Sequence, residues 1–405
     1  MSTLRRTRLK GWYEFYKEPC HICNKRGGCM INEEGDTIVC IRVESDVVFS
    51  KTLLSWVHPL KKKRKVFVDK EYIAGNKKKP ASELHAVYQA LLDETYLTDE
   101  HYQHLTNRGM SDNEIVTRSY RSFPDKAWEI AKILLQQFND FKGIPGFYEN
   151  QYGWTIAGNP GILIPYRNEK NQIIGFQIRV NQPLKEVEIR KISAFKDVNL
   201  DAKVIDQEEN IVEIYVDNEV VEVVKLKLNE THALYKYGAF IKLVEGQRYF
   251  WLSSTNKKNG TSAGNPLPVH VAVPTNELKL WQTGQLKQKN SVWITEGALK
   301  ADIAAEKITK SALREHGMTF LAIAGVNTWR SVFDVLKKMN VKQVNLAFDM
   351  DLLENPLVAQ QLKLFAQELK KQGFAANLAV WNPDDGKGID DVLLNRRIPT
   401  LKKLF

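Results

Sequence analysis

The spacing of apolar residues changes along the chain and divides it into regions. Between residues 81 and 140 the spacing is helical, and one predicted helix has an apolar face made of Leu84, Val87, Tyr88, Leu91 and Leu92. Further helices are predicted over 99–108, from a capping box that begins at Ser111, and over about 125–138. The apolar residues of this region are expected to form a core.

From about residue 150 the pattern becomes that of strands. The sequence GILIPYRNEKNQIIGFQIRV predicts a β-hairpin that turns at 168–171. Residues 195–250 continue the alternation and predict an insertion or a small antiparallel sheet. In roughly the last 115 residues, the strands SVWIT, FLAIAG, QVNLAF and ANLAVW alternate with helices, which predicts a parallel, doubly wound sheet.

Composition and charge narrow the class of protein. The 405 residues are 43% hydrophobic and 26% charged, and no apolar run is long enough to span a bilayer. The basic N-terminus lacks an apolar core after it, so it is not a secretory signal, and we expect a soluble, cytoplasmic protein. Of the net charge of +10, most falls in the first 80 residues, where Lys and Arg outnumber Asp and Glu by 18 to 9. This excess suggests a nucleic-acid partner, or else a solvated basic tail.

All four cysteines of the chain lie within 21 residues, with the spacing C-x2-C-x5-C-x10-C. Clustered thiols in a reducing compartment favour a metal site over disulfides, and four thiolates suit a closed, structural Zn²⁺ site. The alternative is free, buried cysteines. The predicted zinc ligands are Cys20, Cys23, Cys29 and Cys40.

Acidic residues follow the predicted parallel strands. Glu296 directly follows the first strand, Asp349 and Asp351 follow the third, and Asp390 lies in the loop DGKGIDD after the fourth. Since the carboxyl ends of parallel strands meet at one crevice, these carboxylates are expected to converge. Mg²⁺ suits such a set, and the implied chemistry is phosphoryl or nucleotidyl transfer. The alternative is that these residues are helix caps and turn formers.

These segments carry a family resemblance. WITEGALKADIAA and VNLAFDMD resemble the two signatures of the Toprim domain, and LIPYRNEKNQIIGFQIRV, RYFWLSS and HLTNRGMSDNEI resemble the primase RNA-polymerase core. WNPDDGKGIDDVLL resembles the stretch that closes the primase site. With the zinc ribbon, the order is that of bacterial-type DNA primases. The resemblance is greatest to DUF3854 primase-like proteins of phages, plasmids and other mobile elements.

The resemblance implies roles for individual residues. Glu296, Asp349, Asp351 and Asp390 would hold Mg²⁺ or Mn²⁺. The template or incoming nucleotide would face Arg167, Arg179, Arg248, Ser253 and Ser254. Two positions depart from the family pattern, because Lys300 and Gly388 stand where cellular primases have Asp. Lys300, one helical turn after Glu296, would contact a phosphate or neutralise the site.

The predicted fold class is therefore a multi-domain α/β protein. It comprises a zinc ribbon that binds nucleic acid (1–56), a basic linker (57–80), a mixed α+β primase core (81–288) and a Toprim domain with a Rossmann-like sheet (289–405). The implied function is synthesis of short RNA primers from NTPs on single-stranded DNA, in phage or mobile-element replication, with a replicative helicase as partner in trans. The alternatives are a non-catalytic nucleic-acid-binding or helicase-recruiting module and a Toprim nuclease.

Overall fold

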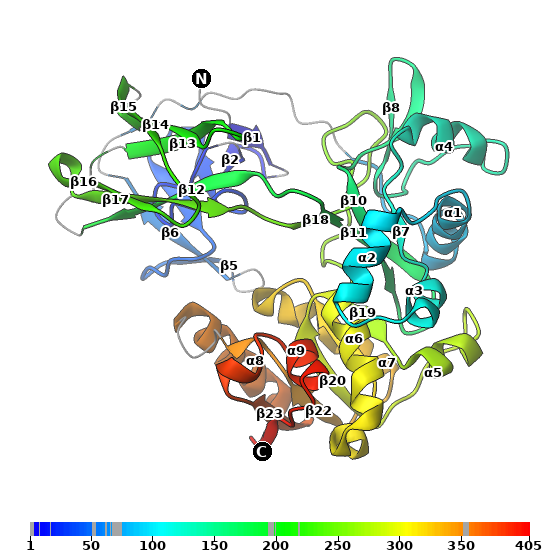
Figure 1. Cartoon of the computed structure of the whole chain (residues 1–405). Helices are drawn as coiled ribbons and strands as arrows, with labels where there is room; N and C mark the ends of the chain where they lie inside the picture. Colours follow the sequence, from blue (N-terminus) through cyan, green and yellow to red (C-terminus); the bar gives the residue numbers. More distant parts are fainter. Residues whose placement is uncertain are drawn as a thin grey trace. The chain divides into compact units, whose positions relative to one another are not determined.

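Two compact units make up the protein, and each combines two separate stretches of the chain (Figure 1). The first unit contains Met1–Ala74 and Gln182–Arg248, and the second contains Gly75–Asn181 and Tyr249–Phe405. The computed structural model describes residues 4–7, 9–16, 18–50, 54–60, 63–64, 66, 75–192, 198, 200–217, 219–350 and 356–405. The predicted domain limits differ from this division, because they assign 182–248 to the primase core.

The N-terminal stretch forms a six-stranded antiparallel sheet in the order β1-β2-β3-β4-β6-β5. Its strands are β1 (Leu4–Arg6), β2 (Trp12–Phe15), β3 (Met30–Asn32), β4 (Thr37–Cys40), β5 (Val48–Ser50) and β6 (Ser55–Pro59). Phe15, Ile31 and Ile38 are buried beside the cysteines, as expected for a small domain with little apolar core. Part of the predicted basic linker, including residues 67–74, lies outside the described residues.

The insertion forms two three-stranded antiparallel sheets. One has the order β12 (Lys185–Lys191), β17 (Ala239–Glu245) and β16 (Thr231–Leu234), and the other has β13 (Leu200–Asp206), β14 (Ile211–Val216) and β15 (Glu219–Lys225). Alternate residues such as Val212, Ile214, Ile241 and Leu243 are fully buried in a core of their own. The antiparallel structure predicted from the alternation is confirmed.

The second unit begins with the predicted helices. They are α1 (Ala81–Asp93), α2 (Asp99–Asn107), α3 (Asp112–Arg118) and α4 (Ala127–Leu134). The five apolar residues predicted on one face of α1 are all buried. The side chain of Ser111 accepts a hydrogen bond from the backbone N–H of Glu114, so the predicted cap of α3 is confirmed.

The predicted hairpin is also confirmed. It consists of β10 (Gly161–Arg167) and β11 (Ile173–Val180), and Asn171 adopts a positive φ of 56° in the turn. It forms the centre of a four-stranded sheet with β7 (Arg121–Ser122) and β18 (Tyr249–Trp251) at its edges. A separate two-stranded sheet contains β8 (Phe147–Asn150) and β9 (Gly153–Ile156).

The C-terminal sheet has the order β19-β21-β20-β22-β23-β24. Its strands are β19 (His270–Ala272), β20 (Ser291–Glu296), β21 (Phe320–Ile323), β22 (Gln343–Leu346), β23 (Ala375–Val380) and β24 (Thr400–Lys403). Strands β20 to β23 are parallel, as predicted, whereas β19 and β24 add antiparallel edges. The strand β19 belongs to this sheet but lies before the predicted domain limit at 289. It was not predicted, because a strand of three residues is too short to show an alternating pattern.

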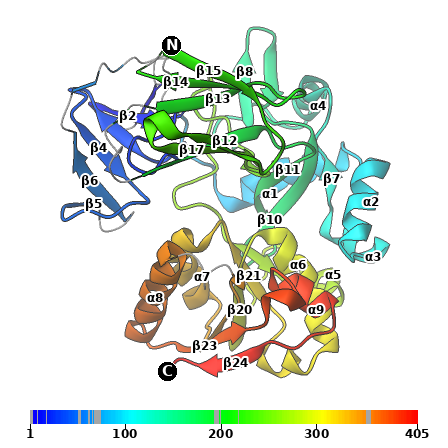
Figure 2. The same cartoon turned by 60° about the vertical axis from the view of Figure 1, so that its left-hand side comes forward.

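Helices cover both faces of this sheet, with α7 (Val332–Lys338) and α8 (Pro356–Lys371) on one side (Figure 2). On the other side lie α6 (Ala298–Lys307) and α9 (Ile389–Leu394), and α5 (Thr275–Leu280) follows β19. Burial on both faces explains why most residues of the parallel strands are apolar. None of the helices in the described part of the chain has the length and apolar character needed to cross a bilayer.

Candidate zinc centre and acidic site

The four cysteines converge in the N-terminal sheet. Their ligand atoms all lie within 4.8 Å of one another, and none is in a disulfide. The first pair is held by a tight turn in which Asn24 N–H donates to the carbonyl of Cys20 at 2.7 Å. Four soft sulfur ligands in a closed, buried cluster fit a structural Zn²⁺ ion, as the spacing predicted.

An arginine lies beside this cluster. The Nη1 atom of Arg42 donates to the carbonyl of Gly27 at 3.0 Å and lies 3.5 Å from Cys29 Sγ and 3.7 Å from Cys23 Sγ. The backbone N–H of Arg42 also donates to Cys40 Sγ at 3.4 Å. Arg42 therefore places a positive charge against sulfur atoms that would carry negative charge when they bind a metal.

The loop between Cys23 and Cys29 also contacts the insertion within the same unit. Asn24 Nδ2 donates to the carbonyl of Ile189 in β12 at 3.2 Å, and Lys25 forms an ion pair with Glu188 of the same strand. These contacts join the predicted zinc centre to residues more than 160 positions later in the chain.

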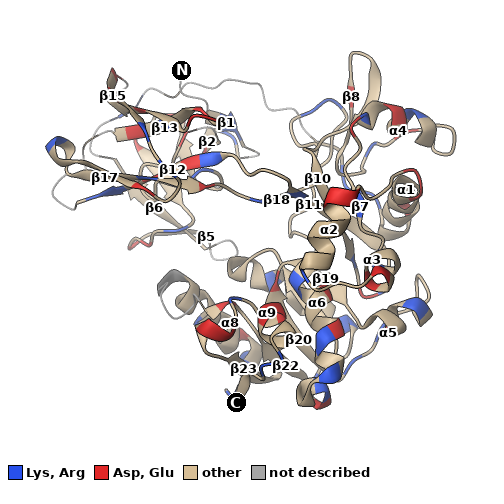
Figure 3. Cartoon of the chain, in the orientation of Figure 1, with Lys and Arg blue, Asp and Glu red and all other residues tan. Residues whose placement is uncertain are grey.

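The parallel sheet positions the predicted acidic residues in the second unit. Glu296 is the last residue of β20, Asp349 follows β22, and Asp390 lies in α9, which follows β23. Because these strands are parallel, their carboxyl ends lie at one edge of the sheet. Acidic and basic segments meet there, where α6 and α9 lie side by side (Figure 3). Asp351, the remaining predicted ligand, lies outside the described residues.

Lys300 contacts the acidic site directly. Its ammonium lies 2.5 Å from each carboxylate oxygen of Asp349. Burial favours the neutral amine, yet the charges of Asp349, Asp390 and Glu296 outweigh burial and raise the pKa of Lys300 above its ordinary value. Lys300 is therefore a cation that interacts with all three described carboxylates.

Asp390 is completely buried and is paired with Arg108. Arg108 Nη2 donates to Asp390 Oδ2 at 2.5 Å, whereas Oδ1 has no hydrogen-bond partner among the described residues. Burial raises the pKa of Asp390, and the charge of Arg108 offsets only part of this rise. Arg108 was not among the residues singled out for the site, although it belongs to the segment HLTNRGMSDNEI that resembles primases.

Gly388 marks the place where these side chains meet. A Cβ atom on Gly388 would lie 2.6 Å from Asp390 Oδ1 and 3.2 Å from both Asp349 Oδ1 and Lys300 Nζ. A side chain at this position would collide with Asp390, so glycine allows two carboxylates and one ammonium to lie this close to the backbone.

The donor set fits a divalent cation of the magnesium type. Mg²⁺ is commonly held by one or two carboxylates together with water and substrate phosphates, and Asp390 Oδ1 is a buried carboxylate oxygen without a partner. Within the described residues, however, the cysteines are the only cluster of three or more metal-ligating side chains close enough to hold an ion. In this arrangement the Lys300 ammonium donates hydrogen bonds to both carboxylate oxygens of Asp349.

The residues predicted to face the template or nucleotide are dispersed. Arg167 is buried, its Nη1 donates to Asn171 Oδ1 at 3.2 Å, and burial lowers its pKa to about 10. Arg179 is half-buried in β11. Arg248 belongs to the other unit, where it pairs with Glu245. None of these contacts reaches the carboxylates.

The two serines also make internal contacts. Ser253 Oγ lies 2.9 Å from Thr255 Oγ1, in the same loop. Ser254 is fully buried, donates to the carbonyl of Phe147 at 2.7 Å and accepts from the N–H of Thr261 at 2.8 Å. The hydroxyl of Ser254 therefore stabilises the loop that follows β18.

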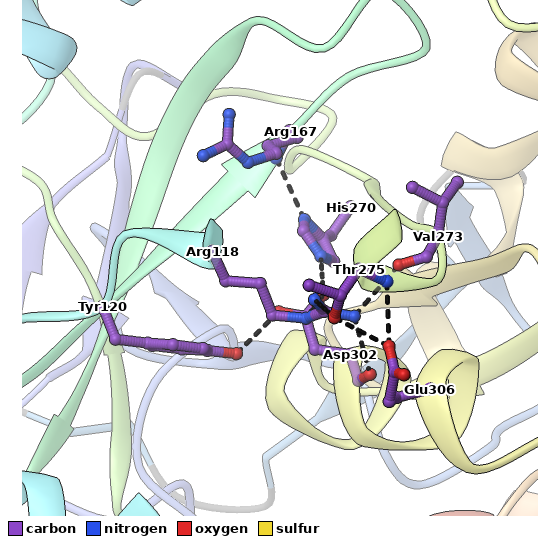
Figure 4. A network of polar contacts seen from close by, with 8 residues as sticks. All are labelled: Arg118, Tyr120, Arg167, His270, Val273, Thr275, Asp302 and Glu306. Carbon is purple, nitrogen blue, oxygen red and sulfur yellow. Dashed lines mark hydrogen bonds and ion pairs between the residues drawn. The ribbon is translucent and has the colours of Figure 1, made fainter. Parts of the chain in front are cut away.

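A buried polar network connects α6 to the segments that precede it (Figure 4). Asp302 of α6 accepts a hydrogen bond from the Tyr120 hydroxyl at 2.6 Å and lies 3.2 Å from both Arg118 Nε and His270 Nε2. The backbone N–H of Arg167 donates to His270 Nδ1, so the ring proton of neutral His270 lies on Nε2 and faces Asp302. Sequence analysis did not identify this network, because its members are dispersed along the chain.

The C-terminal sheet with its acidic edge corresponds to a recognised family. Residues 280–398 match the model described as "Domain of unknown function (DUF3854)". The match confirms the DUF3854 resemblance inferred from the sequence, and the matched residues include every described residue of the acidic site except Arg108. No curated protein matches the chain.

Solved structures similar to this chain include bacterial primases. The zinc-binding and RNA polymerase domains of the Aquifex aeolicus primase are 11% identical with a TM-score of 0.43, over 99% of this chain and 81% of that one. The RNA polymerase domain of Mycobacterium tuberculosis primase DnaG, in complex with a double-stranded DNA oligomer, is 12% identical with a TM-score of 0.43, over 78% and 77%. A DNA primase domain from Pseudomonas aeruginosa is 9% identical with a TM-score of 0.41, over 77% and 74%.

Proposed function

We propose that this protein is a primase-like nucleotidyltransferase that joins ribonucleotides into short primers on single-stranded DNA. The observation that carries the proposal is the meeting of Asp349, Asp390, Lys300 and Arg108 at the carboxyl edge of a parallel sheet. These residues come from four segments that each resemble a primase motif, and the segments lie far apart in the sequence. A set of carboxylates and cations at such an edge suits the handling of phosphates.

Each described side chain has a role in this proposal. Glu296, Asp349 and Asp390, together with Asp351, would hold Mg²⁺ or Mn²⁺. When bound, such an ion stabilises the developing charge on the attacking 3′-hydroxyl oxygen and on the leaving pyrophosphate. Lys300 and Arg108 supply positive charge to the triphosphate, and burial of Asp390 limits the access of water to the site.

The zinc-containing N-terminal sheet would contact the template. The excess of Lys and Arg in the first 80 residues, which lies mostly in the linker 57–80, favours binding to the phosphate backbone rather than the reading of bases. A replicative helicase in trans and a role in phage or mobile-element replication are parts of the same proposal, and they rest on the family resemblance.

A second candidate is a nucleic-acid-binding module without catalysis. The observation that favours it is the pairing of Lys300 with both oxygens of Asp349, which leaves this carboxylate no free oxygen for a metal ion. The absence of a carboxylate at Gly388 points in the same direction.

The test is template-dependent incorporation of labelled NTPs on single-stranded DNA, in Mg²⁺ and in Mn²⁺. We expect short products from the wild type and a loss of about a hundredfold or more in Asp349→Ala, since the metal ligand contributes several kcal/mol. Asp334→Ala, which removes an exposed carboxylate from α7, is the matched control and should retain activity. A folded wild type that binds DNA but makes no product would favour the binding module, and cleavage of the template would indicate a nuclease.

A further inference from the structure

Lys300 occupies an unusual position for a lysine. It is the third residue of α6, and the first turn of this helix contains no acidic residue. A cation at a helix N-terminus is opposed by the helix dipole, so the position itself does not favour Lys. The contact that compensates is the ion pair with Asp349, in which the ammonium lies 2.5 Å from both carboxylate oxygens.

The pair occupies the donor atoms that a divalent ion would need. Only a quarter of the Lys300 side chain and 9% of the Asp349 side chain are exposed, so the pair is largely withdrawn from water. Beside it, Asp390 Oδ1 and Lys300 Nζ lie 2.6 Å and 3.2 Å from where a Cβ atom of residue 388 would be, so both lie close to the backbone of Gly388. The ammonium therefore neutralises the cluster in the way that a bound metal ion would.

We propose that Lys300 is a resident cation of the acidic site and that it competes with the divalent ion for Asp349. This inference rests on the proposed function and extends it. Without nucleotide, Lys300 retains Asp349 and the site binds divalent ions weakly. A nucleoside triphosphate offers Lys300 a second anionic partner, so Asp349 becomes available and the ion enters together with the nucleotide. The ammonium of lysine suits this exchange, since it is a compact charge on a flexible stem.

The proposal predicts the metal affinity of the full-length, zinc-loaded protein without nucleotide. Free Mn²⁺ is measured by electron paramagnetic resonance during titration of each variant. Lys300→Met removes the charge and keeps most of the volume, so it should bind Mn²⁺ about tenfold more tightly than the wild type, the effect expected for one charge at contact distance. Lys300→Arg retains the charge and should bind as weakly as the wild type.

Matched variants separate this effect from a general change in charge. Lys307→Met removes a lysine from the same helix whose partner is Glu114, away from the site, and should leave Mn²⁺ affinity unchanged. Asp349→Asn in the Lys300→Met background should abolish the gain, because it removes the carboxylate that was released. Addition of a non-hydrolysable nucleoside triphosphate should raise the Mn²⁺ affinity of the wild type and have less effect on Lys300→Met.

Equal Mn²⁺ affinity of folded Lys300→Met and wild type would overturn the inference. If Lys300→Met does not fold, Lys300→Gln makes the same test. Failure of this inference can be told apart from failure of the proposed function. If primer synthesis depends on Asp349 but Lys300→Met binds Mn²⁺ as the wild type does, only the competition between Lys300 and the divalent ion is refuted. Tighter Mn²⁺ binding in Lys300→Met without primer synthesis would support the competition and refute the primase proposal.

Discussion

Arg42 lies beside the sulfur atoms of the predicted zinc centre. Four thiolates and one Zn²⁺ ion together carry two negative charges, and the Arg42 guanidinium lies against two of the sulfur atoms. Its hydrogen bond to the carbonyl of Gly27 fixes the guanidinium in this place. Outer contacts of this kind hold ligands in orientation and stabilise the charge of the bound site.

We therefore predict that Arg42→Met weakens zinc binding by about tenfold or more, as is typical when an outer partner of a metal ligand is lost. Transfer of zinc from the purified protein to a chromogenic chelator measures the change. Arg26→Met is the control, since Arg26 is an exposed arginine in the loop between Cys23 and Cys29. Equal rates of zinc transfer in the wild type and Arg42→Met would show that the arginine has no such role.

At the scale of elements, the helix α6 connects the sheet to the segments before it. Asp302 lies in α6, Arg118 ends α3, and His270 begins β19, and all three side chains are buried. Arg118 Nη1 also donates to Thr275 Oγ1 at 2.7 Å at the start of α5. The position of α6, and with it that of Lys300, therefore depends on a shared set of buried charges and hydrogen bonds.

Removal of one partner from this network should destabilise the protein strongly. We predict that Arg118→Met lowers the free energy of unfolding by about 3–5 kcal/mol, because the Asp302 carboxylate would remain buried without its ion pair. Urea unfolding monitored by tryptophan fluorescence measures the change. Arg121→Met is the control, because Arg121 is half-buried and donates to backbone carbonyls nearby. This substitution should lower the free energy of unfolding by less than Arg118→Met does. An equal loss in the two variants would contradict the assigned role.

The same network predicts a dependence of stability on pH. Burial opposes ionisation of Asp302, but His270 and Arg118 outweigh it and hold the pKa at about 2, below the ordinary 3.8. A lowered pKa in the folded state contributes stability above pH 4, and this contribution is lost as the pH falls toward 2. Wild type should therefore exceed Asp302→Asn in unfolding free energy at pH 6, and the difference should narrow by about 2 kcal/mol between pH 4 and pH 2. A difference that does not change with pH would exclude this contribution.

At the scale of the whole molecule, each compact unit is assembled from two stretches of chain. The strand β11 leads out of the second unit into the insertion, and β18 returns to pair with β11. The insertion joins the N-terminal stretch through Asn24 and Lys25, which contact β12. The loop between two of the predicted zinc ligands is thus also a contact surface for the insertion.

Removal of zinc should therefore affect the first unit and spare the second. We predict that chelation raises amide hydrogen exchange by about tenfold or more in β3, β4 and β12, because the small N-terminal core depends on the metal. Strands β20 to β23 should be unchanged. Mass spectrometry of the full chain, with and without chelator, makes the comparison. In zinc-loaded protein, Asn24→Ala should raise exchange at β12 alone. Unchanged exchange in β12 after chelation would show that the insertion is stable without the zinc centre.

The sequence by itself determined the features that depend on local spacing. Three such features were predicted: the helix face from Leu84 to Leu92, the hairpin with its turn at 168–171, and the alternation of parallel strands and helices. They could be predicted because the spacing of apolar residues along the chain shows which face of a helix or strand is buried. The cysteine cluster was predicted for a similar reason, since its ligands lie within one short segment.

Only the tertiary structure decided which charges meet. Asp349 pairs with a lysine 49 positions away, and Asp390 pairs with an arginine 282 positions away. The sequence also did not predict the edge strands β19 and β24. Nor did it predict that residues 182–248 associate with the N-terminal stretch. The physical reason is the same in each case, because a local pattern determines whether a residue is buried, whereas its partner is chosen by the packing of distant segments.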